Sequence, residues 1–320
     1  MVNLIQNVVI PNSNHAVDIF VPDQISKSLN GHPVIFFIHG GAWVMGSKSL
    51  DKEPCQSLAS NGYICVSADY SLSSASTDQI AVVVNVFLVF MLCLAVVSKS
   101  IGQIMFILII SIIVVSFFSI LWTCSAQPIV QHPAHILDIA HAFKWTSEHI
   151  SEYGGNSNQI FVSGHSAGAH LASLLCTNFN YLELINGDPT KIKGCIAISG
   201  VYSDKRLQET QLGSQLLKTV FGVRSQYYDA FPIYNVTTKT PPFLLLNAGK
   251  DYTLKRHSFD FHYALKQAGV YVETAYFFHQ NHMNITKYWR TENDEIMSRV
   301  DNFMADVIQY EQSKMETIIK

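Results

Sequence analysis

The chain has 320 residues, a formal net charge of −3 and 48% hydrophobic residues. This length fits one α/β domain that carries an insertion, and the near-neutral charge excludes the strongly basic surface of a nucleic-acid-binding protein, so no nucleic-acid partner is expected. The six cysteines are dispersed, with no Cys-x-x-Cys pair and no metal-ligand spacing. We therefore expect buried free thiols and no metal site.

Short apolar runs alternate with helical patterns along most of the chain. The expected strands are 17–21, 33–38, 63–68, 159–163, 192–199, 242–247 and 270–278. The expected helices are 54–61, 134–153, 169–175, 257–267 and 294–312. This alternation predicts an α/β fold with a mostly parallel central sheet that is covered by helices on both faces. The stretch 202–239 does not alternate cleanly, and we interpret it as a cap region.

Residues 80–127 form an insertion of different composition, in which Lys99 is the only charged residue. Its two apolar runs, 81–97 and 101–122, are candidate transmembrane segments that would make a helical hairpin. The strands before the insertion and the strand 159–163 must join one sheet, so a single membrane crossing is excluded. The alternative is retained non-coding sequence, because a pyrimidine-rich intron also translates into Phe, Leu, Ile, Val and Ser.

The expected location of the protein depends on this insertion. If the insertion is genuine, we expect membrane association through residues 81–122, and otherwise a cytoplasmic protein. The first six residues lack a basic segment followed by an apolar one, so the sequence predicts no signal peptide. We interpret residues 1–320 as a single domain, and the sequence leaves its oligomeric state open.

The pentapeptide Gly-His-Ser-Ala-Gly at residues 164–168 lies between an apolar strand and an apolar helical run. Gly-x-Ser-x-Gly at a strand-to-helix turn is the nucleophile-elbow pattern, in which small residues such as Gly164 and Gly168 allow a tight turn. The serine hydroxyl then stands at the end of the sheet, where the N–H groups of the next helix point at the reacting oxygen. The pattern predicts that Ser166 is a nucleophile.

A serine nucleophile needs a general base and an acid that orients it, in the chain order Ser, Asp or Glu, then His. Asp251 comes just past the carboxyl end of a predicted strand, so we expect it to be the acid, with helix capping as the alternative. His279 and His282 both follow the last strand. We favour His282 as the base because it lies deeper in the loop, and we interpret His165 and His170 as structural.

The pentapeptide His-Gly-Gly-Ala-Trp at residues 39–43 directly follows a predicted strand. Consecutive glycines let the backbone turn its N–H groups toward a ligand. In hydrolases whose serine nucleophile lies at a strand-to-helix turn, a loop at this position forms the oxyanion hole. The expected donors are the N–H groups of Gly40, Gly41, Ala42 and Ala167. We expect His39 to brace the loop by hydrogen bonding, and Trp43 either to line the acyl pocket or to pack the loop.

The two pentapeptides together resemble the α/β-hydrolase serine carboxylesterases of the hormone-sensitive-lipase-like and kynurenine-formamidase-like branches. Glu-Tyr-Gly-Gly-Asn at 152–156 and Ser-Ala-Gly-Ala-His at 166–170 are also similar to prenylcysteine methylesterases. The likeness covers roughly residues 15–75 and 128–310 and leaves the insertion out.

The resemblance implies an α/β-hydrolase fold and hydrolysis of a small-molecule ester or amide through an acyl-enzyme, without a cofactor. Matched residue by residue, the nucleophile is Ser166, the acid is Asp251 and the base is His282. The loop 280–283 lacks the glycine or aspartate often found before the histidine of the family. Ala42 stands where other branches have a third glycine, which fits the His-Gly-Gly-x-Trp branch.

Several functions remain open at this point. The leading expectation is a serine carboxylesterase, and the same triad would serve an arylformamidase or a prenylcysteine methylesterase. An alternative of another class is a catalytically inactive relative that uses the fold for binding or as a membrane-anchored protein.

Overall fold

The computed structural model describes residues 2–11, 13–23, 31–73, 130–251, 253–287 and 295–319. The chain divides into a unit of residues 1–72 and 131–320, which holds the fold, and a unit of residues 73–130. The predicted insertion 80–127, with its two apolar segments, lies outside the described residues.

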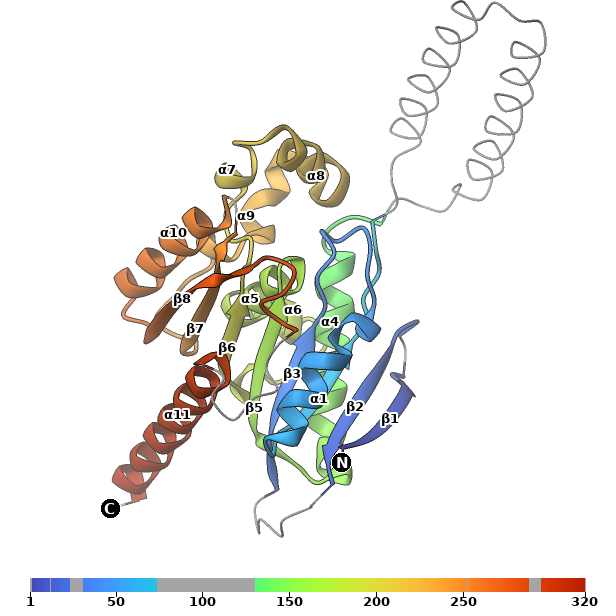
Figure 1. The fold of residues 1–320 in the computed structure, drawn as a ribbon, viewed down its shortest axis with the longest axis vertical. Coiled ribbons are helices and arrows are strands. Elements are labelled where there is room, and N and C mark those ends of the chain that lie inside the picture. The colour runs from blue at the N-terminus through green and yellow to red at the C-terminus, as the bar shows by residue number, and fades with distance from the viewer. Residues whose placement is uncertain are drawn as a thin grey trace, which may run out of the picture. The chain divides into compact units, whose positions relative to one another are not determined.

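The described strands form one eight-stranded sheet in the order β1-β2-β4-β3-β5-β6-β7-β8 (Figure 1). The strands are β1 (Val2–Val9), β2 (Ala16–Pro22), β3 (His32–Ile38), β4 (Ile64–Ala68), β5 (Gly155–His165), β6 (Ile192–Ile198), β7 (Phe243–Lys250) and β8 (Val272–Asn281). β2 runs antiparallel to both β1 and β4, and every other neighbouring pair is parallel. The predicted α/β class with a mostly parallel sheet is confirmed.

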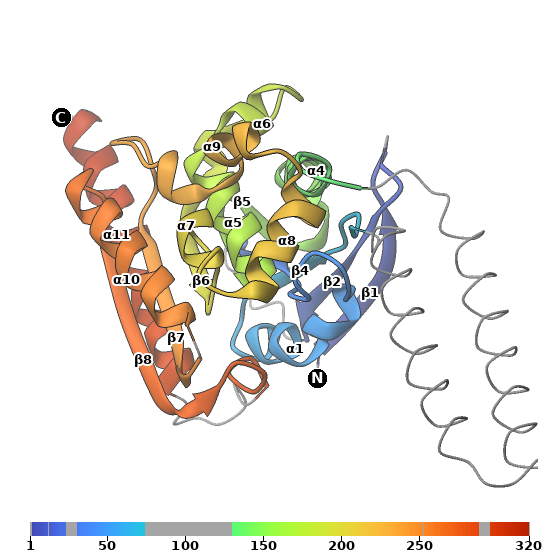
Figure 2. The same cartoon turned by 90° about the horizontal axis from the view of Figure 1, so that it is seen from above.

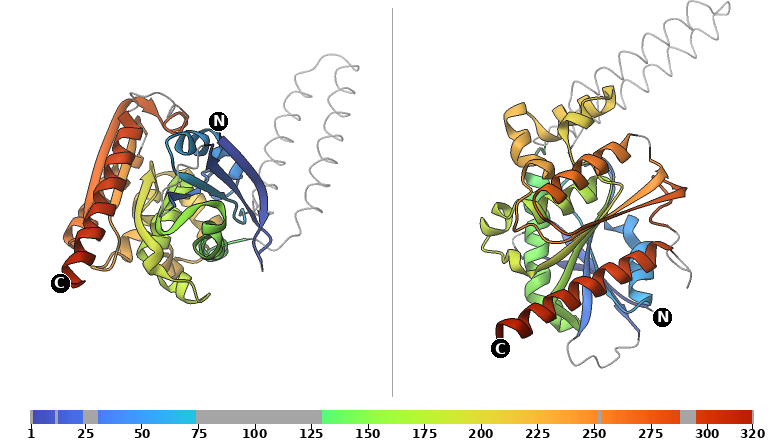
Figure 3. Two further views of the ribbon diagram at one scale, coloured as in Figure 1. Left: turned by 90° about the horizontal axis from the view of Figure 1, so that it is seen from below. Right: turned by 90° about the vertical axis from the view of Figure 1, so that its left-hand side faces the viewer.

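Helices cover both faces of the sheet. The helices are α1 (Lys52–Ser60), α4 (Ala134–His149), α5 (Ala167–Thr177), α6 (Asn180–Glu183), α7 (Asp204–Leu207), α8 (Gln211–Phe221), α9 (Tyr227–Ala230), α10 (Leu254–Gln267) and α11 (Glu295–Ile319). Helices α4, α5 and α10 lie on one face of the sheet, and α1 and α11 lie on the other (Figure 3). Their side chains belong to two separate hydrophobic clusters, one on each face.

β3 shows why the core strands are apolar at every position. Val34 and Phe36 join the hydrophobic cluster on the α4 and α5 face, whereas Ile35 and Phe37 join the cluster beneath α1 and α11. Alternate side chains of a strand point to opposite faces, so a strand covered on both sides needs a continuous apolar run.

The ends of two predicted helices and one further strand show where the structure departs from the sequence prediction. The helix expected over 134–153 ends at His149, and a 3-10 turn carries the chain to Gly154, whose φ of +84° ends it. α11 begins where expected but continues to Ile319. β1 is not among the predicted strands, because it is an edge strand whose side chains are half-buried or exposed and show no apolar alternation.

The region predicted as a cap, 202–239, contains α7, α8, α9 and short 3-10 turns. Figure 2 looks onto the end of the molecule where these helices gather. Its first residues are anchored from α10, because the Nδ1 atom of His257 accepts hydrogen bonds from the backbone N–H groups of Tyr202 at 3.2 Å and Ser203 at 3.3 Å.

The sequence predicts buried free thiols and two candidate transmembrane segments. Cys55, Cys65, Cys176 and Cys195 are buried free thiols, which confirms that prediction for the four cysteines described. Among the described residues, no helix is both long and apolar enough to cross a membrane, and no group of His, Cys, Asp and Glu side chains is arranged to hold a metal ion.

Buried histidines make the stability of this fold dependent on pH. Burial lowers the pKa of His132, His135 and His257 to about 4 and that of His170 to about 3. Because these pKa values lie below the 6.5 of a free histidine, the unfolded chain binds protons first as the pH falls. Their contribution to stability is complete above about pH 6.5 and is lost progressively toward about pH 4.

We predict that the free energy of unfolding, measured by urea titration, falls as the pH is lowered from about 6.5 to about 5. His257→Asn should reduce this slope by up to about 1.4 kcal/mol per pH unit, because the amide oxygen takes the place of Nδ1 as acceptor for the two N–H groups but takes up no proton. A wild-type free energy of unfolding that stays constant over this range would contradict the prediction.

Candidate active site

The turn from β5 into α5 presents Ser166 in a strained backbone conformation. Ser166 has φ 57° and ψ −116°, a region that non-glycine residues rarely adopt, and α5 begins at the next residue. The Ser166 N–H donates to the carbonyl of Ile198 at 2.9 Å, and its own carbonyl accepts from the N–H of His170 at 3.1 Å. These bonds to β6 and to the first turn of α5 hold the serine at the carboxyl edge of the sheet.

The two glycines of this turn are required by contact rather than by positive φ. A Cβ atom on Gly168 would lie 2.0 Å from the carbonyl oxygen of Ile38 and 2.5 Å from that of His39. A Cβ atom on Gly164 would lie 2.5 Å from the carbonyl oxygen of Gly168. The start of α5 therefore packs directly on the backbone at the end of β3, which is possible only without side chains at these two positions.

Ser166, His282 and Asp251 form a continuous hydrogen-bonded row. The Nε2 atom of His282 lies 3.0 Å from the Oγ atom of Ser166, and its Nδ1 atom lies 2.6 Å from an oxygen of Asp251. Because the carboxylate accepts from Nδ1–H, Nε2 is the unprotonated nitrogen and accepts the serine proton. His279, the other histidine considered, is exposed near the end of β8.

Strand pairing explains how two residues 31 positions apart meet. β7 and β8 run in parallel, and Lys250 pairs with Asn281 at their ends after a register shift. Each strand is followed immediately by its functional side chain, Asp251 after β7 and His282 after β8. Asp251 is completely buried, and its second carboxylate oxygen has no hydrogen-bond partner among the described residues.

The loop after β3 folds tightly against the elbow. The N–H groups of Val44 and Met45 both donate to the carbonyl of Gly41, at 3.1 Å and 3.0 Å. Gly41 has φ +121°, and a Cβ atom there would lie 1.9 Å from the carbonyl oxygen of Met45. A Cβ atom on Gly40 would lie 3.3 Å from Cβ of Ser166, so the loop backbone lies beside the serine side chain.

Two backbone features favour N–H donors near the serine. Ala42 has φ 52°, which continues the positive φ of Gly41 before it. Ala167 is the first residue of α5, and the first N–H groups of a helix have no partner within the helix.

His39 stabilises the loop after β3 by hydrogen bonding and ring stacking. Its Nδ1–H donates to the carbonyl of Gly40 at 2.7 Å, and its ring stacks on Tyr70 with the ring centroids 4.3 Å apart. The Tyr70 hydroxyl donates to the carbonyl of His39 at 3.2 Å. Burial lowers the pKa of His39, which keeps the imidazole neutral in this role.

Trp43 anchors the other end of the loop in the core. It is 1% exposed, and its indole N–H donates to Nδ1 of His170 at 3.3 Å. The opposite nitrogen of His170 donates to the carbonyl of Ala230 at 2.8 Å, and Phe221 of α8 packs edge-on against the indole at 5.0 Å. Of the two roles expected for Trp43, these contacts favour packing of the loop over lining of the acyl pocket. They join the loop to α5, α8 and the end of α9.

His165 is the site residue that sequence reasoning missed. Its ring centroid lies 4.7 Å from that of His282, with the two rings tilted by 41°. Burial, and after it the neighbouring charge of His282, lower the pKa of His165 to about 3. The available signal was its place as the variable residue before the serine in Gly-x-Ser-x-Gly, which puts it next to the reacting groups.

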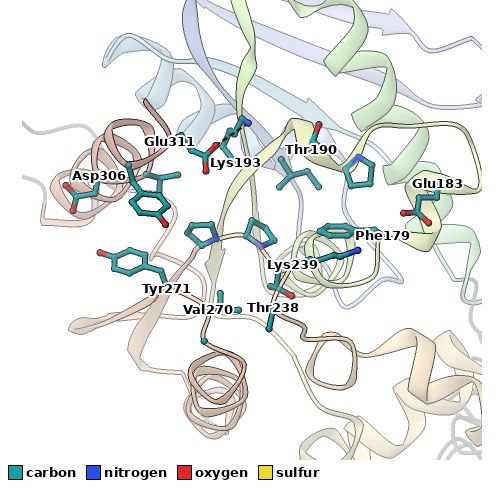
Figure 4. A pocket seen from close by; sticks show the side chains of 18 residues that line it. Phe179, Glu183, Thr190, Lys193, Thr238, Lys239, Val270, Tyr271, Asp306 and Glu311 are labelled. Carbon is teal, nitrogen blue, oxygen red and sulfur yellow. Dashed lines mark ion pairs between the residues drawn. The ribbon is translucent and has the colours of Figure 1, made fainter. Parts of the chain in front are cut away.

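A large cavity of about 1010 Å³ lies elsewhere, at the amino ends of β6 and β7 (Figure 4). Lys193 and Glu311 line this cavity, and the Nζ atom of Lys193 lies 3.9 Å from a carboxylate oxygen of Glu311. Tyr271 lines another part of it. Because Ser166 stands at the carboxyl edge of the same sheet, this cavity is not where the triad side chains meet.

Comparison with known sequences finds a family model, BD-FAE, that matches residues 17–85 and 116–265. The chain is 28% identical over 231 residues to the probable carboxylic ester hydrolase LipM of Mycobacterium tuberculosis, which covers 68% of this chain and 41% of that protein. It is 22% identical over 308 residues to the probable isoprenylcysteine alpha-carbonyl methylesterase ICME of Oryza sativa subsp. japonica. This match covers 91% of this chain and 59% of that protein. The chain thus spans about half the length of these curated relatives.

Solved structures show the same fold. Esterase B from Lactobacillus rhamnosis superposes with a TM-score of 0.69 at 16% identity, covering 98% of this chain and 89% of that one. The thermophilic carboxylesterase EstE1, cloned from a metagenomic library, superposes with a TM-score of 0.63 at 16% identity, covering 96% and 88%. The α/β-hydrolase fold implied by the sequence resemblance is confirmed.

We predict that Gly168→Ala removes most of the reactivity of Ser166 and lowers the free energy of unfolding by about 1–3 kcal/mol, because the new methyl group overlaps two backbone carbonyls. Gly187→Ala is the matched control, since its Cβ atom would lie no closer than 3.1 Å to Leu182. Urea unfolding and covalent labelling of Ser166 by a fluorophosphonate measure the two effects. A Gly168→Ala protein that unfolds and is labelled like the control contradicts the packing argument.

Proposed function

This chain belongs to the BD-FAE family, and on that premise we propose that it hydrolyses carboxylic esters through an acyl-enzyme formed on Ser166. The observation that carries the proposal is the row of hydrogen bonds from Ser166 through His282 to Asp251, at 3.0 Å and 2.6 Å. A nucleophile, a base and an orienting acid at these distances are what acyl transfer by serine requires.

In the proposed reaction, Nε2 of His282 takes the proton of Ser166 while the Oγ atom attacks the ester carbonyl carbon. His282 then gives this proton to the departing alkoxide, and an alcohol leaves. Water attacks the acyl-enzyme in the second half, again losing a proton to His282, which returns it to Ser166 as the acid product leaves. Asp251, completely buried, holds the ring in the required tautomer and stabilises the imidazolium.

We propose that the backbone N–H groups of Gly40, Gly41, Ala42 and Ala167 form the oxyanion hole. The loop backbone at Gly40 lies beside the Ser166 side chain, and Ala167 opens α5 with an N–H group free of the helix. Preorganised donors of this kind stabilise the negative charge of the tetrahedral intermediate and are worth about 10²–10³ in kcat for each donor removed.

The inactive alternative predicts a triad that is incomplete or displaced. Here the two hydrogen bonds of the triad are present, and Ser166 keeps the strained conformation that exposes its hydroxyl. Because such strain costs about 1–3 kcal/mol, a binding or anchoring role alone gives no reason to maintain it. We therefore favour the enzyme.

The substrate is proposed at the level of a small-molecule carboxylic ester. Prenylcysteine methyl esters are a second candidate, supported by the 22% identity to the rice methylesterase over 91% of this chain. An arylformamide is a third, because the same triad cleaves an N-formyl amide. The region 202–239 is proposed to act as the cap that selects among them, since α8 packs against the 39–43 loop through Phe221 and Trp43.

We also propose that residues 80–127 are a genuine apolar insertion that attaches the enzyme to a membrane. Two uncharged apolar runs, 81–97 and 101–122, support this proposal, because each approaches the length that spans a bilayer. The family match is interrupted over residues 86–115, which supports an addition to the family fold rather than part of it.

We predict that Ser166→Ala lowers ester hydrolysis to background and abolishes fluorophosphonate labelling. Asp251→Asn should lower kcat by about 10²–10⁴-fold, because the amide favours the wrong tautomer of His282. His282→Ala should match Ser166→Ala, whereas the exposed His279→Ala serves as the control and keeps wild-type rates. Rates on acyl esters, a prenylcysteine methyl ester and N-formylkynurenine identify the substrate, and hydrolysis that survives Ser166→Ala refutes the mechanism.

For the insertion, we predict that the full chain sediments with membranes in high salt and carbonate, whereas a variant lacking residues 80–127 stays in the supernatant and keeps its esterase activity. The deletion is tolerated because the strands on either side already meet in one sheet. Sequencing of mature transcripts across codons 75–130 tests the alternative. Messages that all lack the segment would show that it is retained non-coding sequence.

A further inference from the structure

His165 contacts two parts of the proposed machinery besides the serine that follows it. Its ring lies 4.7 Å from the ring of His282, and its Nδ1 atom would lie 3.2 Å from a Cβ atom placed on Gly40. It is also the last residue of β5, whose pairing with Ile198 of β6 fixes its backbone. One imidazole therefore lies against the base, the oxyanion loop and the elbow.

The environment of His165 keeps it uncharged. Burial is the largest cause that lowers its pKa, to about 3, and the charge of His282 acts in the same direction. The backbone of His282 and the charge of Asp251 oppose this shift only in part. Its Nε2 atom is buried without a hydrogen-bond partner among the described residues, so no acid is placed there to stabilise a proton.

We propose that His165 is a positioning residue for His282. Its neutral ring supports one side of the His282 imidazole, so that Nε2 of His282 stays 3.0 Å from Ser166 Oγ. This inference rests on the proposed function, because it assigns a role toward the base of that reaction.

Two physical reasons make this support necessary. His282 sits in a turn over residues 282–287 rather than in a helix or strand, and its side chain is 20% exposed. A displacement of about 1 Å between base and nucleophile lowers rates by about 10²-fold. When His282 becomes an imidazolium, a second charged ring beside it would oppose that charge, whereas a neutral ring excludes water without adding charge.

Three substitutions test the support that the ring gives. His165→Phe keeps a ring without its nitrogen atoms, His165→Asn keeps a polar side chain without the ring, and His165→Ala removes both. We expect His165→Asn and His165→Ala to lower kcat by about 10-fold or more with KM changed by less than about twofold, because positioning acts on the chemical step, whereas His165→Phe keeps the ring and most of kcat. In His165→Ala, water entering beside His282 stabilises the imidazolium and moves the acidic limb of the kcat/KM pH profile to higher pH. His165→Phe leaves that limb in place.

The control is His149→Phe, at the end of α4 just before β5 begins and therefore at the opposite edge of the sheet from Ser166. It should keep wild-type kcat and pH profile. Wild-type kcat in His165→Ala overturns the proposal, as does a loss explained by the folded fraction measured in urea. Failure of the proposed function itself is recognised separately, because the wild-type protein would then hydrolyse no ester, or hydrolysis would survive Ser166→Ala.

Discussion

The close approach of α5 to the end of β3 is the contact on which the rest of the site depends. At Gly168 there is room for a hydrogen but not for a methyl group, since a Cβ atom would lie 2.0 Å from the carbonyl oxygen of Ile38. This approach forces the sharp turn at Ser166 and brings the loop at Gly40 beside it. The nucleophile and the donors of the proposed oxyanion hole are thus products of one packing constraint.

The parallel sheet supplies the other half of the site. Because β5, β7 and β8 run in the same direction, their carboxyl ends meet at one edge, and the residues that follow them are brought together from distant parts of the chain. Asp251 is buried at that edge and His282 is partly exposed, which is the order expected of an orienting acid behind a base that must reach substrate. Buried histidines around this edge, His39 and His170 among them, serve packing and hydrogen bonding.

Much of the fold could be predicted from sequence because the core strands are covered on both faces and therefore appear as continuous apolar runs. β1 was not predicted, for the opposite reason. It is an edge strand, and its pairing with β2 defines it rather than the pattern of its side chains. Trp43 and His165 show the same limit within the site. Their residue types permit several roles, and only the neighbours they meet after folding, His170 for one and His282 for the other, distinguish among these roles.

Local sequence pattern was sufficient for the elbow, the glycine loop and the chain order of nucleophile, acid and base, because each depends on residue size or on the position just after a strand. Tertiary structure alone decided which histidine meets Ser166. His279 and His282 are three residues apart and chemically identical, but β8 continues to Asn281, so His279 stays exposed on the strand and His282 reaches the turn where Asp251 and Ser166 converge. The length of β8, which its pairing with β7 sets, therefore determines which of the two histidines reaches Ser166.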